Sequence, residues 1–194
     1  MGYPSSQGLY DPANEHDACG VGMVAHIKGD KSHAIIAQAL EILEKLDHRG
    51  AVGSDPLLGD GAGILIQIPD ALIRRWAEAH GHDLPGPGEY GIAMCFLPQD
   101  EAARAFVKAR MEAFTVKEGQ RFIGWREVPT TLEGLGAAVI ASMPVVQMAV
   151  IARGVNCAGQ DGFERKLLTI RKQVQNPLAS LAAKHGLPAL TDTY

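Results

Sequence analysis

Apolar residues recur along this chain at two spacings, one typical of helices and the other typical of strands. Helical spacing predicts amphipathic helices that begin near Ser32, Asp70, Asp100 and Asp161. Alternating or continuous apolar runs predict strands at residues 19–27, 64–68, 90–97, 122–128 and 145–152. Because strands and helices alternate with short links, the pattern predicts an α/β or α+β layered domain.

Capping and turn residues mark the ends of these elements. Asp161 and Glu164 have the spacing of a capping box. Asn176-Pro177 offers a further cap, with proline at the first position of a short helix. Glycines that suit the residue after a helix stand at positions 50, 81 and 186. The first helix is therefore predicted to stop near residues 48–50.

Composition and charge narrow the classes of function. With 194 residues, 46% hydrophobic and 21% charged, the chain has the composition of a globular protein with a sizeable core. A net charge of −4 and 6% aromatic residues give no reason to expect a nucleic-acid partner. No apolar run reaches membrane-spanning length, and residues 1–18 lack a secretion signal. The 3 cysteines form no Cys-x-x-Cys pair, which favours a reducing cytoplasm over disulfides.

The run from Glu15 to Gly22 carries the first candidate for chemistry, since Cys19 stands where an apolar segment follows a short polar leader. Cleavage between Ala18 and Cys19 would give one residue both a thiol and a free α-amino group. Such an amine, with a pKa of about 7.7–8.0, can accept the proton of a thiol whose pKa is about 8.5. The alternative is that Cys19 is a small buried hydrophobe, as free cysteines commonly are.

Other motifs have plainer interpretations on the residues alone. The glycine-rich segment 59–63 has neither dinucleotide nor Walker spacing and precedes a predicted strand, so a tight turn is favoured. His80-x-His82 could hold a metal, but it lacks a third ligand nearby, which favours a solvated loop. Arg49-Gly50 could recognise a carboxylate or hold an N-terminal cysteine. On the residues alone, a favourable interaction of Arg49 with the helix dipole is the better explanation of that pair.

Several of these segments together resemble one family. They are Gly8-Leu9-Tyr10-Asp11-Pro12, Glu15-His16-Asp17-Ala18-Cys19-Gly20-Val21-Gly22, His48-Arg49-Gly50-Ala51, Gly59-Asp60-Gly61-Ala62-Gly63, Phe96-Leu97-Pro98-Gln99, Gly124-Trp125-Arg126 and Phe163-Glu164-Arg165-Lys166-Leu167. In this order they resemble the start of the large subunit of bacterial glutamate synthases. The resemblance covers nearly all of the chain.

The resemblance implies an N-terminal-nucleophile, class II glutamine amidotransferase domain, an α+β four-layer αββα sandwich that is truncated here. It implies a propeptide-like leader at residues 1–18 and a partial amidotransferase domain at residues 19–194. Cys19 would be the catalytic nucleophile that attacks L-glutamine, and Arg49 and Gly50 would line its substrate pocket. The resemblance implies no cofactor or metal in this chain.

The resemblance also implies partners and missing parts. The parent would carry FMN and an iron–sulfur cluster elsewhere in its large subunit and draw electrons from a small subunit or from ferredoxin. The family's domain continues to an Asn-Gly pair that forms the oxyanion hole, and this chain contains no Asn-Gly dipeptide. We therefore expect negligible glutaminase activity from residues 1–194 alone and a marginally stable chain with uncovered sheet edges. A non-catalytic binding or regulatory module on the same scaffold is the main alternative, and an unrelated small-molecule-binding domain is a weaker one.

Overall fold

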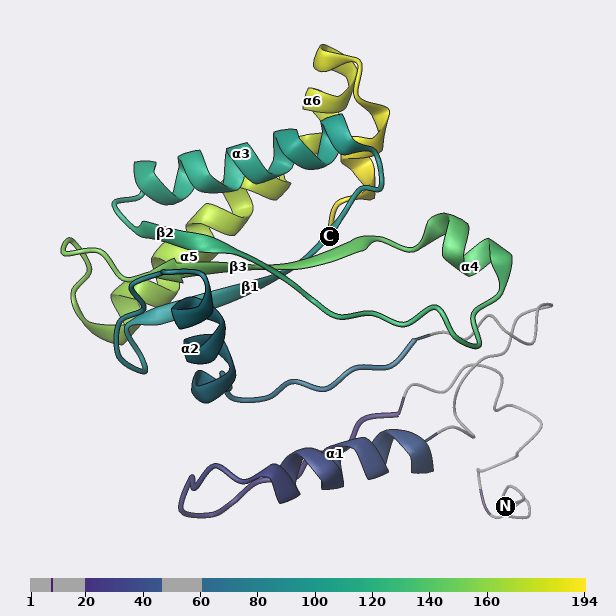
Figure 1. Cartoon of the computed structure of the whole chain (residues 1–194), viewed down its shortest axis with the longest axis vertical. Coiled ribbons are helices and arrows are strands. Elements are labelled where there is room, and N and C mark those ends of the chain that lie inside the picture. The colour runs from purple at the N-terminus through teal and green to yellow at the C-terminus, as the bar shows by residue number, and fades with distance from the viewer. Residues whose placement is uncertain (1–7, 9–19, 47–60) are drawn as a thin grey trace. The chain divides into compact units, whose positions relative to one another are not determined.

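A computed structural model describes residue 8 and residues 20–46 and 61–194 (Figure 1). The chain divides into two compact units, Met1–Gln67 with Leu132–Ala141, and Ile68–Thr131 with Ser142–Tyr194. Each unit is described here by itself. Apart from residue 8, the predicted leader lies outside the described residues.

The second unit is built on an antiparallel sheet of three strands. These are β1 (Tyr90–Leu97), β2 (Arg121–Glu127) and β3 (Val145–Ala152), in the order β1-β3-β2. The predicted bounds of β1 and β3 are confirmed, and β2 begins one residue earlier than predicted. Central β3 is apolar at nearly every position, as expected for a strand covered on both faces.

Helices α3 (Glu101–Lys117) and α5 (Gly159–Gln175) cover one face of this sheet. The carboxylate of Asp100 accepts a hydrogen bond from the backbone N–H of Ala103, which confirms the predicted start of α3. The main core lies between the helices and the sheet, with its most buried members at Leu97, Ala103, Val107, Ala149, Ile151, Phe163, Ile170 and Leu190. The apolar stripe read from the sequence is therefore the face that packs on the strands.

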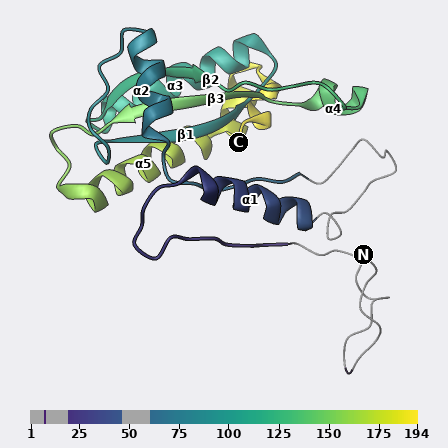
Figure 2. The same cartoon turned by 60° about the horizontal axis from the view of Figure 1, so that its bottom comes forward.

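Helix α2 (Asp70–Ala79) packs on the opposite face of the sheet, as Figure 2 shows. Ile73 and Ala77 are buried in this second cluster together with Tyr90, whose hydroxyl donates a 2.8 Å hydrogen bond to Asp70. Burial and this hydrogen bond raise the pKa of the Tyr90 hydroxyl above its ordinary value. Helix α2 covers only part of this face. The side chains of Met94 and Phe96 of β1 show this, since they remain 44% and 40% exposed.

The end of the chain adds α6 (Leu178–His185) and the 3₁₀ helix η3 (Pro188–Asp192). Gly186 has φ +66°, which confirms the predicted left-handed residue after α6. Two capping predictions are wrong. Helix α5 begins at Gly159 after Ala158, without the side-chain cap of a capping box, and Pro177 takes the cap position of α6 because Asn176 remains helical.

The first unit contains α1 (His33–Lys45) and most of the short helix α4 (Ala137–Ser142), which was not predicted. Ser32 caps α1 by accepting a 3.1 Å hydrogen bond from the backbone N–H of Ala34, as predicted. Helix α1 ends at Lys45, earlier than the predicted stop near residues 48–50, because its last backbone hydrogen bonds close at the Leu46 cap.

The two strands predicted in the first unit are wrong for the residues that the structure describes. Residues 20–27 and 64–68 form no strand there, and the side chains of Val21, Ile27 and Leu65 are almost fully exposed. An apolar run becomes a strand only when another strand pairs with it. The described part of the molecule thus mixes helices and strands, as an α+β domain does, and its one described sheet is the three-stranded one.

Candidate active site

The residues predicted to do chemistry, Cys19, Arg49 and Gly50, lie outside the described residues. Two described residues stand near them in the sequence. Gly20 follows Cys19 directly, and Leu46, the cap of α1, precedes Arg49 by three positions.

The segment that follows Cys19 packs tightly against α1. A Cβ atom added at Gly20 would lie 2.8 Å from Cδ2 of Leu46. One added at Gly22 would lie less than 3.0 Å from Cγ2 of Ile42, a distance that real Cβ atoms do not show. Glycine at these two positions lets the backbone approach the helix closely, which fixes the segment after Cys19 beside the C-terminal half of α1.

The end of α1 also bears on the two interpretations of Arg49. The helix ends at Lys45, whose cation already occupies the last turn. The favourable interaction with a helix dipole falls off within that turn. Arg49 stands four residues beyond Lys45 in the sequence and lies outside the described residues, so both interpretations of Arg49 stay predictions.

Cys95 is poorly suited to nucleophilic chemistry. Its side chain is buried in the main core, and its thiol donates a weak 3.6 Å hydrogen bond to the carbonyl of Ala93. Burial raises the pKa of the Cys95 thiol to about 11, against a smaller lowering by the backbone of Ala149. The thiol therefore stays protonated near neutral pH and behaves as a small hydrophobe.

Cys157 is held in a hydrogen-bonded loop before α5. Its sulfur lies 3.2 Å from Nε2 and 3.4 Å from Oε1 of the buried Gln120 side chain. The same Oε1 accepts a 2.9 Å hydrogen bond from the backbone N–H of Gly154. These contacts tie the loop to the start of β2, so Cys157 belongs to the structural framework of the second unit.

The histidines at positions 80 and 82 are not a simple solvated pair. Both rings pack against Trp76, with ring centres 5.6 Å and 5.0 Å from the indole. The two imidazoles lie parallel with centres 6.2 Å apart, and Nδ1 of His80 lies 2.8 Å from the carbonyl oxygen of Trp76. Among the described residues no group of three or more His, Cys, Asp and Glu could hold a metal ion.

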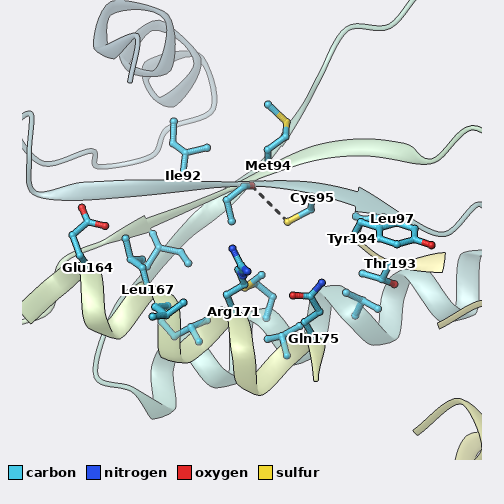
Figure 3. Close-up of a pocket in the computed structure, with 17 residues that line it drawn as sticks. Ile92, Met94, Cys95, Leu97, Glu164, Leu167, Arg171, Gln175, Thr193 and Tyr194 are labelled. Atoms are coloured by element: carbon cyan, nitrogen blue, oxygen red, sulfur yellow. Dashed lines mark hydrogen bonds between the residues drawn. The ribbon is translucent and has the colours of Figure 1, made fainter. Parts of the chain in front are cut away.

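A cavity of about 590 Å³ lies in the second unit between edge strand β1 and α5 (Figure 3). Its floor is apolar and includes Cys95, Val107 and Ile170, while Glu164, Arg171, Gln175 and Thr193 bring polar atoms to it. The sequence pattern did not predict this cavity. The helical pattern identified the apolar stripe of α5, but a cavity depends on what covers the strand edge beside it, which the local sequence does not show.

None of the described helices is both long and apolar enough to span a lipid bilayer.

Comparison with known proteins defines the class of protein. The family model described as class-II glutamine amidotransferases matches residues 19–189. The chain therefore belongs to the class II glutamine amidotransferases, a family of enzymes.

Individual relatives carry the comparison further. The chain is 44% identical over 173 residues to the glutamate synthase [NADPH] large chain of Bacillus subtilis, covering 89% of this chain and 11% of that protein. It is 34% identical over 165 residues to ferredoxin-dependent glutamate synthase 2 of Synechocystis, with 85% and 10% covered. It is 37% identical over 179 residues to the glutamate synthase [NADH] of Schizosaccharomyces pombe, with 88% and 8% covered. The chain spans about a tenth of the length of these relatives.

Proposed function

We propose that this chain is the N-terminal portion of the glutaminase domain of a glutamate synthase, with Cys19 as its nucleophile. The family assignment and the relatives that are named glutamate synthases support this proposal. The family match begins at residue 19, the residue that becomes the mature N-terminus if residues 1–18 are a cleaved propeptide. The parent would use the released ammonia for reductive synthesis of glutamate from 2-oxoglutarate in the cytoplasm.

The chemistry follows from one residue that carries both groups. After cleavage, the free α-amine of Cys19 takes the proton of its own thiol. The thiolate attacks the side-chain amide carbon of L-glutamine, and the C–N bond breaks as the nitrogen takes the proton from the α-ammonium group and leaves as ammonia. The resulting glutamyl thioester is hydrolysed by water, which releases glutamate and restores the thiol.

The surroundings of Gly20 support a shared site for the three predicted residues. Gly20 lies against Leu46, Cys19 is next to Gly20 in the chain, and Arg49 is three residues from Leu46. Three residues of chain span at most about 10 Å, so the length of the chain is compatible with a shared site for Cys19 and Arg49. In this proposal Arg49 and Gly50 line the glutamine pocket.

The proposed fold of the complete domain is the four-layer αββα sandwich. The partly uncovered face of the described sheet supports it, because Met94 and Phe96 are exposed apolar side chains beside the area that α2 covers. A second sheet stacked about 10 Å away would bury them. The remainder of the large subunit would supply this sheet.

In this proposal FMN and the iron–sulfur cluster of the parent lie in other regions of its large subunit. A small subunit or ferredoxin donates the electrons. An iron–sulfur cluster is usually held by four cysteine thiolates. This chain has 3 cysteines, and the described ones are the buried Cys95 and the Gln120-bound Cys157. These residues do not fit a cluster, and FMN and the cluster take no part in the chemistry proposed for Cys19.

The proposal is tested by labelling with a glutamine-like electrophile, such as a diazoketone analogue of glutamine, followed by peptide mass mapping. The full-length parent is expected to lose glutaminase activity on stoichiometric modification of Cys19. Cys19→Ala removes both activity and labelling, whereas the matched control Cys157→Ala retains both. Labelling at Cys157, or activity that survives Cys19→Ala, would overturn the proposal, and an unmodified parent without glutaminase activity would favour a non-catalytic module.

A further inference from the structure

The apolar face of α1 ends in two side chains that stand one helical turn apart. Ile42 and Leu46 are separated by four positions, so they lie on the same face of the helix, and both are half-buried. The described segment that begins at Gly20 runs alongside this helix, as Figure 2 shows. A Cβ atom added at Gly22 would meet Ile42, and one added at Gly20 would meet Leu46. Each glycine thus lies opposite one apolar side chain of α1.

The two contacts differ in how far the helix side chain can give way. At Gly22 the nearest atom is Cγ2 of Ile42, and the Cβ atom of Ile42 is only 3.5 Å away. Isoleucine is branched at Cβ and its χ1 angle is restricted in a helix, so this methyl group cannot turn away. At Gly20 the nearest atoms are the terminal methyls of Leu46, at 2.8 Å and 3.0 Å, which move with χ2. Ile42 is therefore the rigid contact, although Gly22 is farther than Gly20 from Cys19 in the sequence.

The backbone carries this contact to the predicted nucleophile. Cys19 precedes Gly20 directly, and consecutive Cα atoms joined by a trans peptide bond are about 3.8 Å apart. If a side chain at Gly22 kept the segment from approaching α1, the segment would have to move by several tenths of an ångström or more. The rate of a nucleophilic attack depends on distances of this size, since a displacement of about 1 Å can lower it by about 100-fold.

We propose that Ile42 is a positioning residue for the glutaminase reaction. It sets the height of residues 20–22 above α1 and thereby the position of Cys19, and Leu46 is a softer second contact. This inference rests on the proposed function, in which Cys19 is the nucleophile, and Ile42 acts only through the backbone. A displaced nucleophile impairs the chemical step but leaves the substrate pocket in place, so the effect belongs in kcat and not in KM.

Steady-state glutaminase kinetics of the full-length parent test this role, with kcat expressed per molecule that carries a labelled Cys19. Gly22→Ala is expected to lower kcat by about 10- to 100-fold while KM changes by less than about threefold. Gly20→Ala places its Cβ closer to the nucleophile in sequence but against the flexible Leu46. It is therefore expected to lower kcat by less than about threefold.

Crossed double variants separate positioning from general destabilisation. Gly22→Ala with Ile42→Ala removes the colliding methyl, so kcat is expected to recover to within about fivefold of the unsubstituted parent. Gly22→Ala with Leu46→Ala also truncates one apolar side chain of α1 but keeps the collision, so kcat is expected to stay low. If Gly22→Ala prevents cleavage of the leader, the fraction of mature N-terminus, measured by intact mass, becomes the readout for the same two double variants.

The outcomes for this role and for the proposed function differ. Equal recovery in the two double variants, a larger loss of kcat in Gly20→Ala than in Gly22→Ala, or a loss confined to KM would overturn the role of Ile42. Failure of the proposed function is seen in the parent before Gly20 or Gly22 is changed. In that case its glutaminase activity survives Cys19→Ala, or Cys19 is not labelled.

Discussion

Gly22→Ala tests whether the segment after the predicted nucleophile is held against α1. The added Cβ would lie less than 3.0 Å from Cγ2 of Ile42. That methyl belongs to a β-branched side chain with a restricted χ1 angle, so the helix or the segment must move instead. Overpacking of this kind costs about 1–3 kcal/mol. Gly20→Ala is expected to cost less than about 1 kcal/mol, because the terminal methyls of Leu46 can turn away.

The assay is hydrogen exchange of the amides in the last turn of α1, since both tryptophans, Trp76 and Trp125, lie in the other unit. A loss of 1–3 kcal/mol accelerates local opening by about 5- to 150-fold. Adding Ile42→Ala to Gly22→Ala is expected to recover part of the loss, so the double variant is more stable than the sum of the single effects. Unchanged exchange in Gly22→Ala, or strict additivity in the double variant, would refute the proposed packing.

Three further predictions concern the second unit. Gly154→Ala is expected to destabilise this unit by more than about 3 kcal/mol, because the added Cβ would collide with the backbone of Gly119. The free energy of unfolding is measured by urea denaturation followed by tryptophan fluorescence. Gly86→Ala, which has open space around the added Cβ, is the control. At pH 8 alkylation of Cys95 is expected to be more than about 100-fold slower than alkylation of Cys19, because a pKa of about 11 leaves little Cys95 in the thiolate form. The two rates are measured by peptide mass mapping, and equal rates would contradict the burial of Cys95. Hydrogen bonds from Lys166 and Gln173 lower the pKa of Glu118 below its ordinary value of 4.5. The stabilisation by ionised Glu118 is therefore present above that pH and lost as the pH falls. Glu118→Gln should make the free energy of unfolding fall less steeply at acid pH, and an unchanged fall would refute this role.

The second unit could largely be predicted from its sequence, because each of its elements carries its own signals. The continuous apolar runs at residues 90–97 and 145–152 predicted both strands, and Asp100 and Gly186 marked helix ends by side-chain and backbone chemistry that is local. The start of α5 was misplaced because a capping-box spacing at Asp161 does not guarantee that the cap forms. Helix α4 carried no capping signal and was missed.

The predictions for the first unit failed where the outcome depends on partners distant in sequence. Residues 20–27 and 64–68 have the composition of buried strands, yet Val21 and Leu65 are exposed among the described residues. Strand formation needs a neighbouring strand, which the local pattern does not contain. The same limit applies to the cavity beside β1, since its lining comes from β1, α3 and α5, which are separate in the sequence. The roles of Cys19, Arg49 and Gly50 remain predictions that rest on the family and on the residues beside them.

The most direct test of the central claim is the intact mass and N-terminal sequence of the protein purified from its own cells. If Cys19 supplies both the nucleophilic sulfur and the base, the mature polypeptide begins with Cys19 and lacks residues 1–18. A mature polypeptide that retains Met1 or any part of the leader would leave Cys19 without a free amine and would contradict the account.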